Sequence, residues 1–342
     1  MLDDLVMIHE RDAQDALGIA EKQWEQLAYE FDLPDIHFTP ENIVYSGMGG
    51  SALGALLATT WPGFTIPFVI SRDYSIPAFT SHKTLFIASS YSGNTEETLE
   101  ALERAEATGA TIVVVAAGGK LVDIAKEKGY PLAILPQASQ PRYAVLYGFK
   151  ALITILQKVG LLSVEDINDE LAQATEFLKQ TTAQWRPDVA TNNNLAKQLA
   201  LEVIGKSVVV YGGPLTYPAA YKWKISFNEN AKNIAWVNQY SEFNHNEFLG
   251  WTSHPLDKPY AVIDLRSNLE HPQIQKRFLL SERLLSGRRP APLVVDAQGT
   301  TKLEQLVWLV ALGDFVSLYT ALLNGLNPTP VDLIEKFKKE LV

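Results

Sequence analysis

The chain contains no cysteine among its 342 residues. This absence excludes disulfides, thiol nucleophiles, iron–sulfur clusters held by thiolates and zinc sites built on cysteine. Basic residues are also in the minority, with 29 lysines and arginines against 39 acidic residues, so the formal net charge is -10. Such a charge argues against a general nucleic-acid-binding surface but leaves room for a local anion site.

Long apolar segments are missing as well, because no run approaches the roughly 20 residues needed to span a bilayer. The N-terminal sequence MLDDLVMIHERD is acidic where a signal or transit peptide would be basic. We therefore expect a cytoplasmic protein. Hydrophobic residues make up 47% of the chain, which is enough for a substantial core, and the length suits two ordinary domains.

Short apolar runs alternate with helical stretches between residues 42 and 136. Strands are expected at 43–46, 68–71, 85–89, 111–116 and 132–135, and helices at 51–60, 95–108 and 121–129. This alternation favours a mostly parallel, doubly wound α/β sheet, in which ligands bind at the carboxyl ends of the strands.

A second strand–helix block begins near residue 207, and its strand, Gly-Gly pair and helix weakly echo the first block. Later strands are expected at 260–265 and 292–297. The sequence thus predicts two similar three-layer αβα domains with mostly parallel doubly wound sheets. We assign them to residues 1–155 and 201–342, with a helical bridge at 156–200.

The loop SYSGNT, residues 90–95, places three hydroxyl side chains besides a tyrosine where a strand passes into a helix. Thr95 suits the N-cap position, so the unpaired N–H groups of the helix point towards the loop. Such an arrangement forms an anion pocket. The same residue types are also common in turns that bind nothing, and the loop alone leaves both interpretations open.

A second loop, GMGGSA at residues 47–52, also follows a strand and precedes a helix. Its Gly47, Gly49 and Ala52 fit the G-x-G-x-x-A spacing of dinucleotide-binding proteins, with Asp73 at a suitable distance downstream. The glycines could equally serve a tight turn alone. A pyrophosphate is bound by backbone N–H groups and few side chains, so the hydroxyls of the partner loop favour a sugar phosphate.

The segment YKWKISFNENAKNIAW has apolar residues at helical spacing, Trp223, Phe227, Ala231 and Ile234, with Glu229 between two asparagines in the helix interior. Asparagine is a poor helix former, so this polar group is either a solvated face or a positioned carboxylate. As a carboxylate held by amide neighbours, Glu229 is a candidate general base.

His245 lies in the segment SEFNHNEFLGW, where a polar cluster is surrounded by aromatic residues. A single histidine is often structural, but a neutral imidazole is also suited to moving a hydroxyl proton. We do not expect a metal site, because His245 and Glu247 lack a convincing third ligand.

Arg142 follows Pro141 at an expected helix start, where a cation opposes the helix dipole and invites an anionic partner. The alternative is an ordinary surface arginine.

Taken together, GMGGSA, SYSGNTEET, the Pro141–Arg142 pair, FNENAKN and NHNEFLGW resemble the bifunctional phosphoglucose/phosphomannose isomerases of the sugar isomerase (SIS) domain superfamily. The resemblance runs from about Ile43 to the C-terminus. The SYSGNT loop alone is typical of any SIS domain, whereas the Asn-Glu-Asn and NHNE segments in this order are specific to the isomerases.

The resemblance implies an aldose–ketose isomerase of carbohydrate metabolism that interconverts glucose 6-phosphate and mannose 6-phosphate with fructose 6-phosphate, in glycolysis or gluconeogenesis. It implies a phosphate site, general acid/base chemistry without a metal or other cofactor, and a homodimer. The phosphate site would consist of Gly50, Ser51, Ser90, Ser92 and Thr95.

The resemblance also implies the catalytic roles. Glu229 would move a proton between C2 and C1 through an enediolate, and Arg142 would stabilise the negative charge. His245 would open the sugar ring from the neighbouring subunit. A C-terminal lysine would lie near the ring oxygen; Lys338 fits the spacing best, and Lys336 and Lys339 are the alternatives.

Three other functions fit the sequence less well. A non-catalytic SIS-domain sensor of sugar phosphates needs a DNA-binding or partner module, and the sequence has no such motif. A dinucleotide-dependent oxidoreductase would give no role to SYSGNT or Asn-Glu-Asn. The glucosamine-forming amidotransferases share the fold but need an N-terminal cysteine that this chain lacks.

Overall fold

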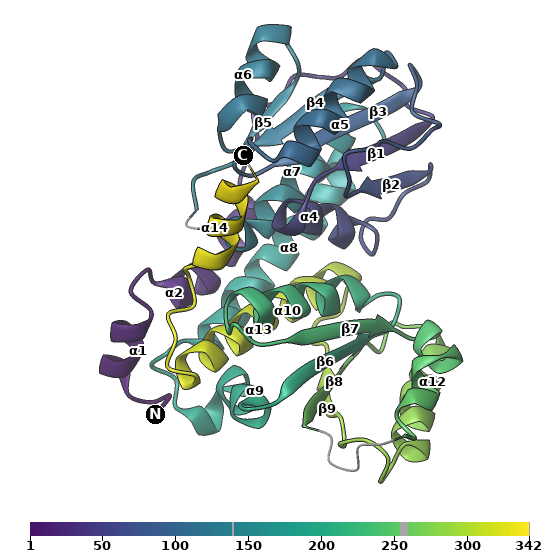
Figure 1. Cartoon of the computed structure of the whole chain (residues 1–342). Coiled ribbons are helices and arrows are strands. Elements are labelled where there is room, and N and C mark those ends of the chain that lie inside the picture. The colour runs from purple at the N-terminus through teal and green to yellow at the C-terminus, as the bar shows by residue number, and fades with distance from the viewer. Residues whose placement is uncertain (139, 254–258, 342) are drawn as a thin grey trace. The chain divides into compact units, whose positions relative to one another are not determined.

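The computed structural model describes residues 1–138, 140–253 and 259–341. The chain divides into two compact units, each built on its own parallel sheet (Figure 1). Unit 2 is Gln23–Glu176, and unit 1 combines Met1–Lys22 with the chain from Phe177 onward. The predicted α/β class with two parallel sheets is therefore confirmed.

The sheet of unit 2 has the strand order β2-β1-β3-β4-β5, with every neighbouring pair parallel. Its central strand, β3, is buried along all seven of its residues, as a strand covered on both faces must be. The order reverses direction between β1 and β3, which is the topological switch point of a doubly wound sheet. The strands are β1 (Asn42–Ser46), β2 (Phe68–Ser71), β3 (Thr84–Ser90), β4 (Thr111–Ala116) and β5 (Leu132–Ile134).

Helices cover both faces of this sheet. α5 (Glu96–Ala107) and α6 (Gly119–Lys128) pack on one face, where Leu102 and Leu121 meet Phe86 and Val114. On the other face α4 (Gly49–Ala58) packs tightly against α7 (Val145–Lys158). A Cβ atom on Gly54 would come within 2.5 Å of the Phe149 nitrogen, so only glycine allows this approach. The other helices are α3 (Gln23–Ala28), η1 (Pro141–Tyr143) and α8 (Val164–Thr182), which continues into unit 1.

The sheet of unit 1 has the strand order β7-β6-β8-β9, again parallel throughout. One face packs against α10 (Tyr217–Glu229) and, through it, against α13 (Lys302–Leu323). The opposite face carries an aromatic core beneath η4 (Glu242–His245), α11 (Glu247–Gly250) and α12 (Pro272–Leu284). The strands are β6 (Ser207–Gly212), β7 (Ala235–Gln239), β8 (Tyr260–Arg266) and β9 (Leu293–Asp296), and the remaining helices are α1 (Leu5–Arg11), α2 (Ala16–Glu21), η2 (Ala183–Trp185), η3 (Thr191–Asn193), α9 (Leu195–Val203) and α14 (Asp332–Glu340).

α13 is the central helix of unit 1. Its 22 residues are long and apolar enough to cross a membrane by composition alone, but 94% of its most apolar 18-residue window is buried inside the protein. It begins at a capping box between Thr301 and Glu304. Its apolar surface is therefore accounted for as the core of unit 1.

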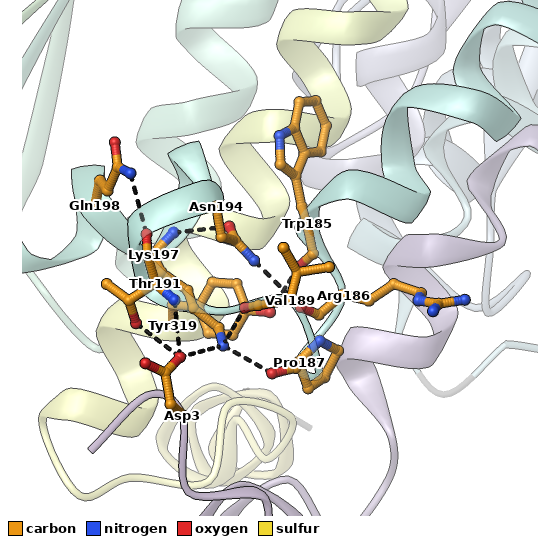
Figure 2. A network of polar contacts seen from close by, with 10 residues as sticks. All are labelled: Asp3, Trp185, Arg186, Pro187, Val189, Thr191, Asn194, Lys197, Gln198 and Tyr319. Atoms are coloured by element: carbon orange, nitrogen blue, oxygen red, sulfur yellow. Dashed lines mark hydrogen bonds and ion pairs between the residues drawn. The ribbon is translucent and has the colours of Figure 1, made fainter.

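The first residues of the chain are tied to unit 1 by the buried ammonium of Lys197. Its Nζ donates to the carboxylate of Asp3 at 3.0 Å and to the carbonyl oxygens of Pro187 and Val189 at 2.7 and 2.8 Å (Figure 2). Asp3 also accepts from Thr191. The compact units differ from the domains assigned from the sequence in two places. Residues 1–22 belong to unit 1 instead of the N-terminal domain, and the boundary within α8 divides the segment 156–200 that was assigned as a bridge.

One local prediction was wrong. The sequence pattern extended a helix as far as Ile234, whereas α10 ends at Glu229, Lys232 has a φ of 51°, and β7 begins at Ala235. Ile234 is 58% exposed and lies on no helix face. The helix stops because Lys232 Nζ, rather than further helical turns, satisfies carbonyl oxygens at its end, including that of Glu229 at 3.0 Å.

Candidate functional site

The two Gly- and Ser-rich loops meet at the switch point of the first sheet. GMGGSA follows β1 and SYSGNT follows β3, and these neighbouring strands flank the point where the strand order reverses. Ligands of doubly wound sheets bind at this place, outside the carboxyl ends of the strands. The topology thus brings the predicted phosphate residues to one crevice edge.

Hydrogen bonds join the two loops. The hydroxyl of Ser51 accepts the N–H of Tyr91 at 3.0 Å, and the hydroxyl of Tyr45 donates to the Ser51 carbonyl at 3.2 Å. Burial raises the pKa of Tyr45 to about 12, so its hydroxyl stays a donor over the whole physiological range. Ser90 Oγ lies 2.7 Å from Thr95 Oγ1 and 3.4 Å from Ser92 Oγ. The structure therefore gathers the hydroxyls of SYSGNT and links their loop to Ser51.

The helices that start at these loops lack side-chain caps. Thr95 occupies the N-cap position of α5 as predicted, but its hydroxyl contacts Ser90 instead of the helix N–H groups. Among the described residues, no side chain caps the N-terminus of α4 or of α5. By contrast, α9 and α13 are capped by Asn194 and Thr301. Two uncapped N-termini at one sheet edge leave N–H donors for an anion.

Glycines let the backbone close in around this edge. A Cβ on Gly50 would come within 3.1 Å of the backbone nitrogen of Arg142, and one on Gly93, which has a φ of 68°, would overlap the Gly118 carbonyl. Gly50 thus admits the Pro141–Arg142 backbone beside the start of α4. The loops after β1, β3 and β4 and the Pro141–Arg142 turn form one compact rim.

Arg142 is buried, with only 1% of its surface exposed, so the interpretation as an ordinary surface arginine is wrong. Arg142 and Tyr143 both belong to η1, just before α7, and the Arg142 guanidinium lies 4.6 Å from the centre of the Tyr143 ring. A guanidinium offers several N–H donors in a fixed planar arrangement and is suited to stabilising negative charge.

Glu229 is the last residue of α10 in unit 1, and its two asparagine neighbours hold the helix end. Asn228 Nδ2 donates to the carbonyl of Asn233 at 2.9 Å, and Asn230 Nδ2 donates to Ser317 Oγ on α13 at 2.9 Å. The amides therefore anchor the backbone on both sides of Glu229. The carboxylate is partly exposed at a rigid helix terminus.

His245 is exposed and ends η4, while the residues around it are firmly held. Asn244 Nδ2 donates to Ser281 Oγ on α12 at 2.9 Å. Glu247 accepts from the hydroxyl of Tyr211 and, at 2.7 Å, from Asn238 Nδ2. The polar cluster seen in the sequence thus anchors the segment to β6, β7 and α12 and presents the imidazole to solvent.

Glu229 and His245 lie at opposite ends of β7. β6 and β7 are parallel, α10 connects them, and so Glu229 is at the edge where β7 begins, whereas His245 follows the end of β7. The five residues of β7 alone span about 17 Å. Within unit 1 the structure therefore does not bring these two side chains together.

Comparison with known proteins decides the family. Residues 192–341 match the family described as bacterial phospho-glucose isomerase C-terminal SIS domain. A bifunctional phosphoglucose/phosphomannose isomerase from Caldicellulosiruptor bescii is 36% identical over 306 residues, covering 88% of this chain and 89% of that protein. The chain belongs to the bifunctional phosphoglucose/phosphomannose isomerases.

Two further proteins place this isomerase chain more broadly. A crystal structure of a glucose-6-phosphate isomerase-like protein from Thermus thermophilus superposes with a TM-score of 0.66 at 19% identity, covering 99% of this chain and 98% of that one, which shows the fold. A D-glucosamine-6-phosphate 4-epimerase from Sulfolobus acidocaldarius is 35% identical over 230 residues, covering 66% of this chain and 69% of that protein. The predicted pair of SIS-type domains is confirmed, and the sensor alternative is not favoured.

Asp73, the acidic residue that a dinucleotide site would require, does not support that alternative. Asp73 is exposed after β2, where its carboxylate accepts from the N–H of Tyr74 at 2.7 Å within its own turn. Across the described residues, no group of three or more His, Asp or Glu side chains could hold a metal ion. Because the chain belongs to an isomerase family, the glycine loop does not indicate dinucleotide binding. The hydroxyl loop SYSGNT is the more informative of the two loops at this sheet edge.

Lys338 lies on α14, which is exposed along its length. Its Nζ pairs with Glu335 at 2.9 Å, while Lys336 pairs with Glu340 at 3.8 Å. These are ordinary pairs within one helix. The choice of Lys338 over Lys336 and Lys339 stays a prediction.

The second sheet of this isomerase chain has a loop that corresponds to GMGGSA, and a carboxylate fills it. The N–H of Leu215 donates to Glu270 Oε1 at 2.8 Å, at the turn between β6 and α10. A Cβ on Gly213 would come within 2.3 Å of the same oxygen, so a larger residue there would displace the Glu270 carboxylate from the turn. Burial raises the pKa of Glu270, although the N–H groups oppose the rise. The sequence pattern missed this residue, because nothing local links position 270 to the loop at 213.

Proposed function

We propose that this chain is an aldose–ketose isomerase that interconverts glucose 6-phosphate, and also mannose 6-phosphate, with fructose 6-phosphate. The observation that carries the proposal is the hydroxyl cluster at two uncapped helix N-termini, in a chain of this family. Hydroxyls and N–H groups at such a site suit a compact phosphate monoester.

In the proposed mechanism the phosphate is held by Ser51, Ser90, Ser92, Thr95 and the backbone at Gly50. Glu229 removes the C2 proton of the open-chain aldose and, after this proton has had time to exchange with solvent, delivers a proton to C1. The proton of the C2 hydroxyl passes to the C1 oxygen, so that the C1 oxygen becomes a hydroxyl and C2 becomes a carbonyl. No atom is gained or lost, so the reaction needs general acid/base groups and no external oxidant.

Three further groups complete this mechanism. Arg142 stabilises the enediolate oxygen, a role supported by its burial and by the hydrogen-bond donors of its guanidinium. His245 moves the proton that opens the ring, and Lys338 lies near the ring oxygen.

The direct test is to incubate the purified chain with fructose 6-phosphate in the presence of EDTA and to follow glucose 6-phosphate and mannose 6-phosphate separately. Both products are expected. Glucose 6-phosphate alone would narrow the activity to one substrate, and a product inverted at C4, seen by NMR, would point instead to epimerase chemistry like that of the Sulfolobus relative. Phosphosugar binding without turnover would restore the sensor alternative.

Removing the Thr95 hydroxyl tests the phosphate site. Thr95→Val keeps the side-chain shape and is expected to raise KM about 10-fold, with kcat changed by less than about 3-fold, because a hydrogen bond to a charged group is lost. The matched control is Thr108→Val at the other end of α5, whose hydroxyl donates to a helix carbonyl. Equal KM values for the two variants would exclude Thr95 from phosphate binding.

We further propose a homodimer in which His245 serves the active site of the neighbouring subunit. The separation of Glu229 and His245 along β7 supports this arrangement, and so does the exposure of Leu249 beside His245, at 73%. A complete site then requires Glu229 from one chain and His245 from the other.

Mixing two strongly impaired variants, each with only residual turnover, tests the shared site. Glu229→Gln and His245→Ala subunits, exchanged at equal ratio, are expected to regain about a quarter of the wild-type activity, because half of the dimers are hybrids with one intact site of two. The size of the dimer is checked by sedimentation. If verified subunit exchange restores no activity, His245 does not act in trans.

A cytoplasmic location and a role in glycolysis or gluconeogenesis complete the proposal. Cell fractionation checks the first, and growth of a deletion strain on glucose or mannose checks the second.

A further inference from the structure

Arg289 lies in an unusual environment in unit 1. It is in the loop between α12 and β9 and is only 7% exposed. Its guanidinium carbon lies 5.4 Å from the ring centre of Tyr211, 5.7 Å from that of Phe243 and 6.0 Å from that of Trp251. Three aromatic rings, one from β6 and two from the segment 240–251, therefore lie around one cation.

The Arg289 guanidinium and the Tyr240 hydroxyl act on each other electrostatically, but no geometric hydrogen bond joins them. None of the three guanidinium nitrogens has a hydrogen-bond partner within the described residues. Leaving buried donors unpaired is costly, so the rings and a nearby counter-charge must hold the cation. The counter-charge is Asp264 on β8: burial raises the pKa of this carboxyl, and the positive charge of Arg289 acts against the rise.

An apolar side chain of similar size would fill the same space without the desolvation cost of a charge. Arg289 is therefore poorly explained as a stabilising core residue. Its directional contacts with three ring faces instead fix the relative placement of those rings.

Two of the three rings belong to the segment that carries His245. Phe243 precedes His245 on η4, and Trp251 follows α11. The third ring, Tyr211 on β6, accepts from Trp251 Nε1 at 3.0 Å and donates its hydroxyl to Glu247. His245 itself is exposed, so its orientation depends on the backbone that these residues hold.

We propose that Arg289 is a positioning residue that fixes the segment 240–251, and through it the imidazole of His245, for the ring-opening step. This inference rests on the proposed function of His245 in an isomerase. It assigns no contact between Arg289 and the substrate.

The test is a double-mutant cycle with hexose 6-phosphate turnover as the readout. Arg289→Met is expected to lower kcat at least 10-fold, while the inhibition constant of inorganic phosphate, which reports on unit 2, changes less than about 2-fold. Arg289→Lys keeps the charge and should recover most of the lost activity. Arg288→Met, at the exposed neighbouring position, is the matched control and should match the wild type.

The decisive arm uses the His245→Ala background. If Arg289 acts through His245, adding Arg289→Met there should lower kcat by less than about 2-fold. If the double variant loses as much kcat as the product of the two single losses, the inference is overturned. It is also overturned if Arg289→Met lowers kcat while His245→Ala has the kcat of the wild type. If Arg289→Met does not fold, Phe243→Leu removes one ring of the same group and should give the same pattern. An inactive wild-type protein would instead mean that the proposed function has failed.

Discussion

Glu229→Gln is expected to lower kcat about 10³-fold or more, because a carboxamide cannot accept the proton that a carboxylate removes from carbon. The geometry limits the damage to the chemical step. Glu229 ends α10, its neighbours Asn228 and Asn230 bind elsewhere through their amides, and the proposed phosphate residues belong to unit 2. Inorganic phosphate should therefore inhibit the variant's residual turnover with an inhibition constant within about 2-fold of the wild-type value.

Two measurements separate a catalytic from a structural loss in this variant. Incubation of fructose 6-phosphate in D₂O should place deuterium on C1 or C2 with the wild-type protein and not with Glu229→Gln. Glu202→Gln, an exposed glutamate of unit 1, is the control and should behave as the wild type. A parallel loss of phosphate binding and turnover would show that Glu229 supports the structure instead of acting as the base.

Much of the fold could be predicted from the sequence because its signals are local. The strands β1 to β4 are apolar runs, each with a serine or threonine at one end at least, and their observed ends differ from the predicted ones by no more than one residue. The loops after β1 and β3 were placed correctly at the carboxyl edge, since parallel strands leave all strand-to-helix loops on that side. Local patterns therefore sufficed to place the two loops to which the proposed phosphate residues belong.

The errors and omissions arise from contacts between distant residues. The helix was extended to Ile234 and β7 was not predicted, because the end of α10 depends on Lys232, whose ammonium also donates to carbonyls of Asn327 and Pro328 almost 100 residues away. Arg289 and Glu270 were missed for the same reason, since their partners lie on β6 and its following turn. No window of sequence contains both sides of these contacts.

Glu270 also explains why one chain carries one proposed phosphate site although it has two similar sheets. In the first sheet the helix N-terminus after β1 is uncapped, whereas the corresponding turn of the second sheet already holds an internal carboxylate. That carboxylate supplies the negative charge that the proposed phosphate would supply at the first sheet. In the proposed function, unit 1 therefore contributes the acid/base candidates on α10 and η4 and not a second phosphate site.

The second large expected effect concerns the buried ion pair that joins α10 to α13. Lys222 Nζ donates to Ser226 Oγ at 2.7 Å and to the carboxylate of Asp314 on α13, and Ser226 Oγ lies 2.8 Å from the same carboxylate. Lys222 is 0% and Asp314 is 2% exposed. Asp314→Ala is expected to lower the free energy of unfolding of unit 1 by about 3–5 kcal/mol, because it leaves a buried ammonium without its counter-ion.

The double variant Lys222→Met/Asp314→Leu provides the control for this prediction, since removing both charges also removes the desolvation cost. Its stability should lie within about 1 kcal/mol of the wild type or above it. Urea titrations of the three proteins, followed by far-UV circular dichroism, give the comparison. A single variant as stable as the wild type would mean that the pair is not needed to hold α10 on α13. If the double variant folds but turns over slowly, the pair sets the placement of Glu229 at the end of α10 and not only the stability of the helix.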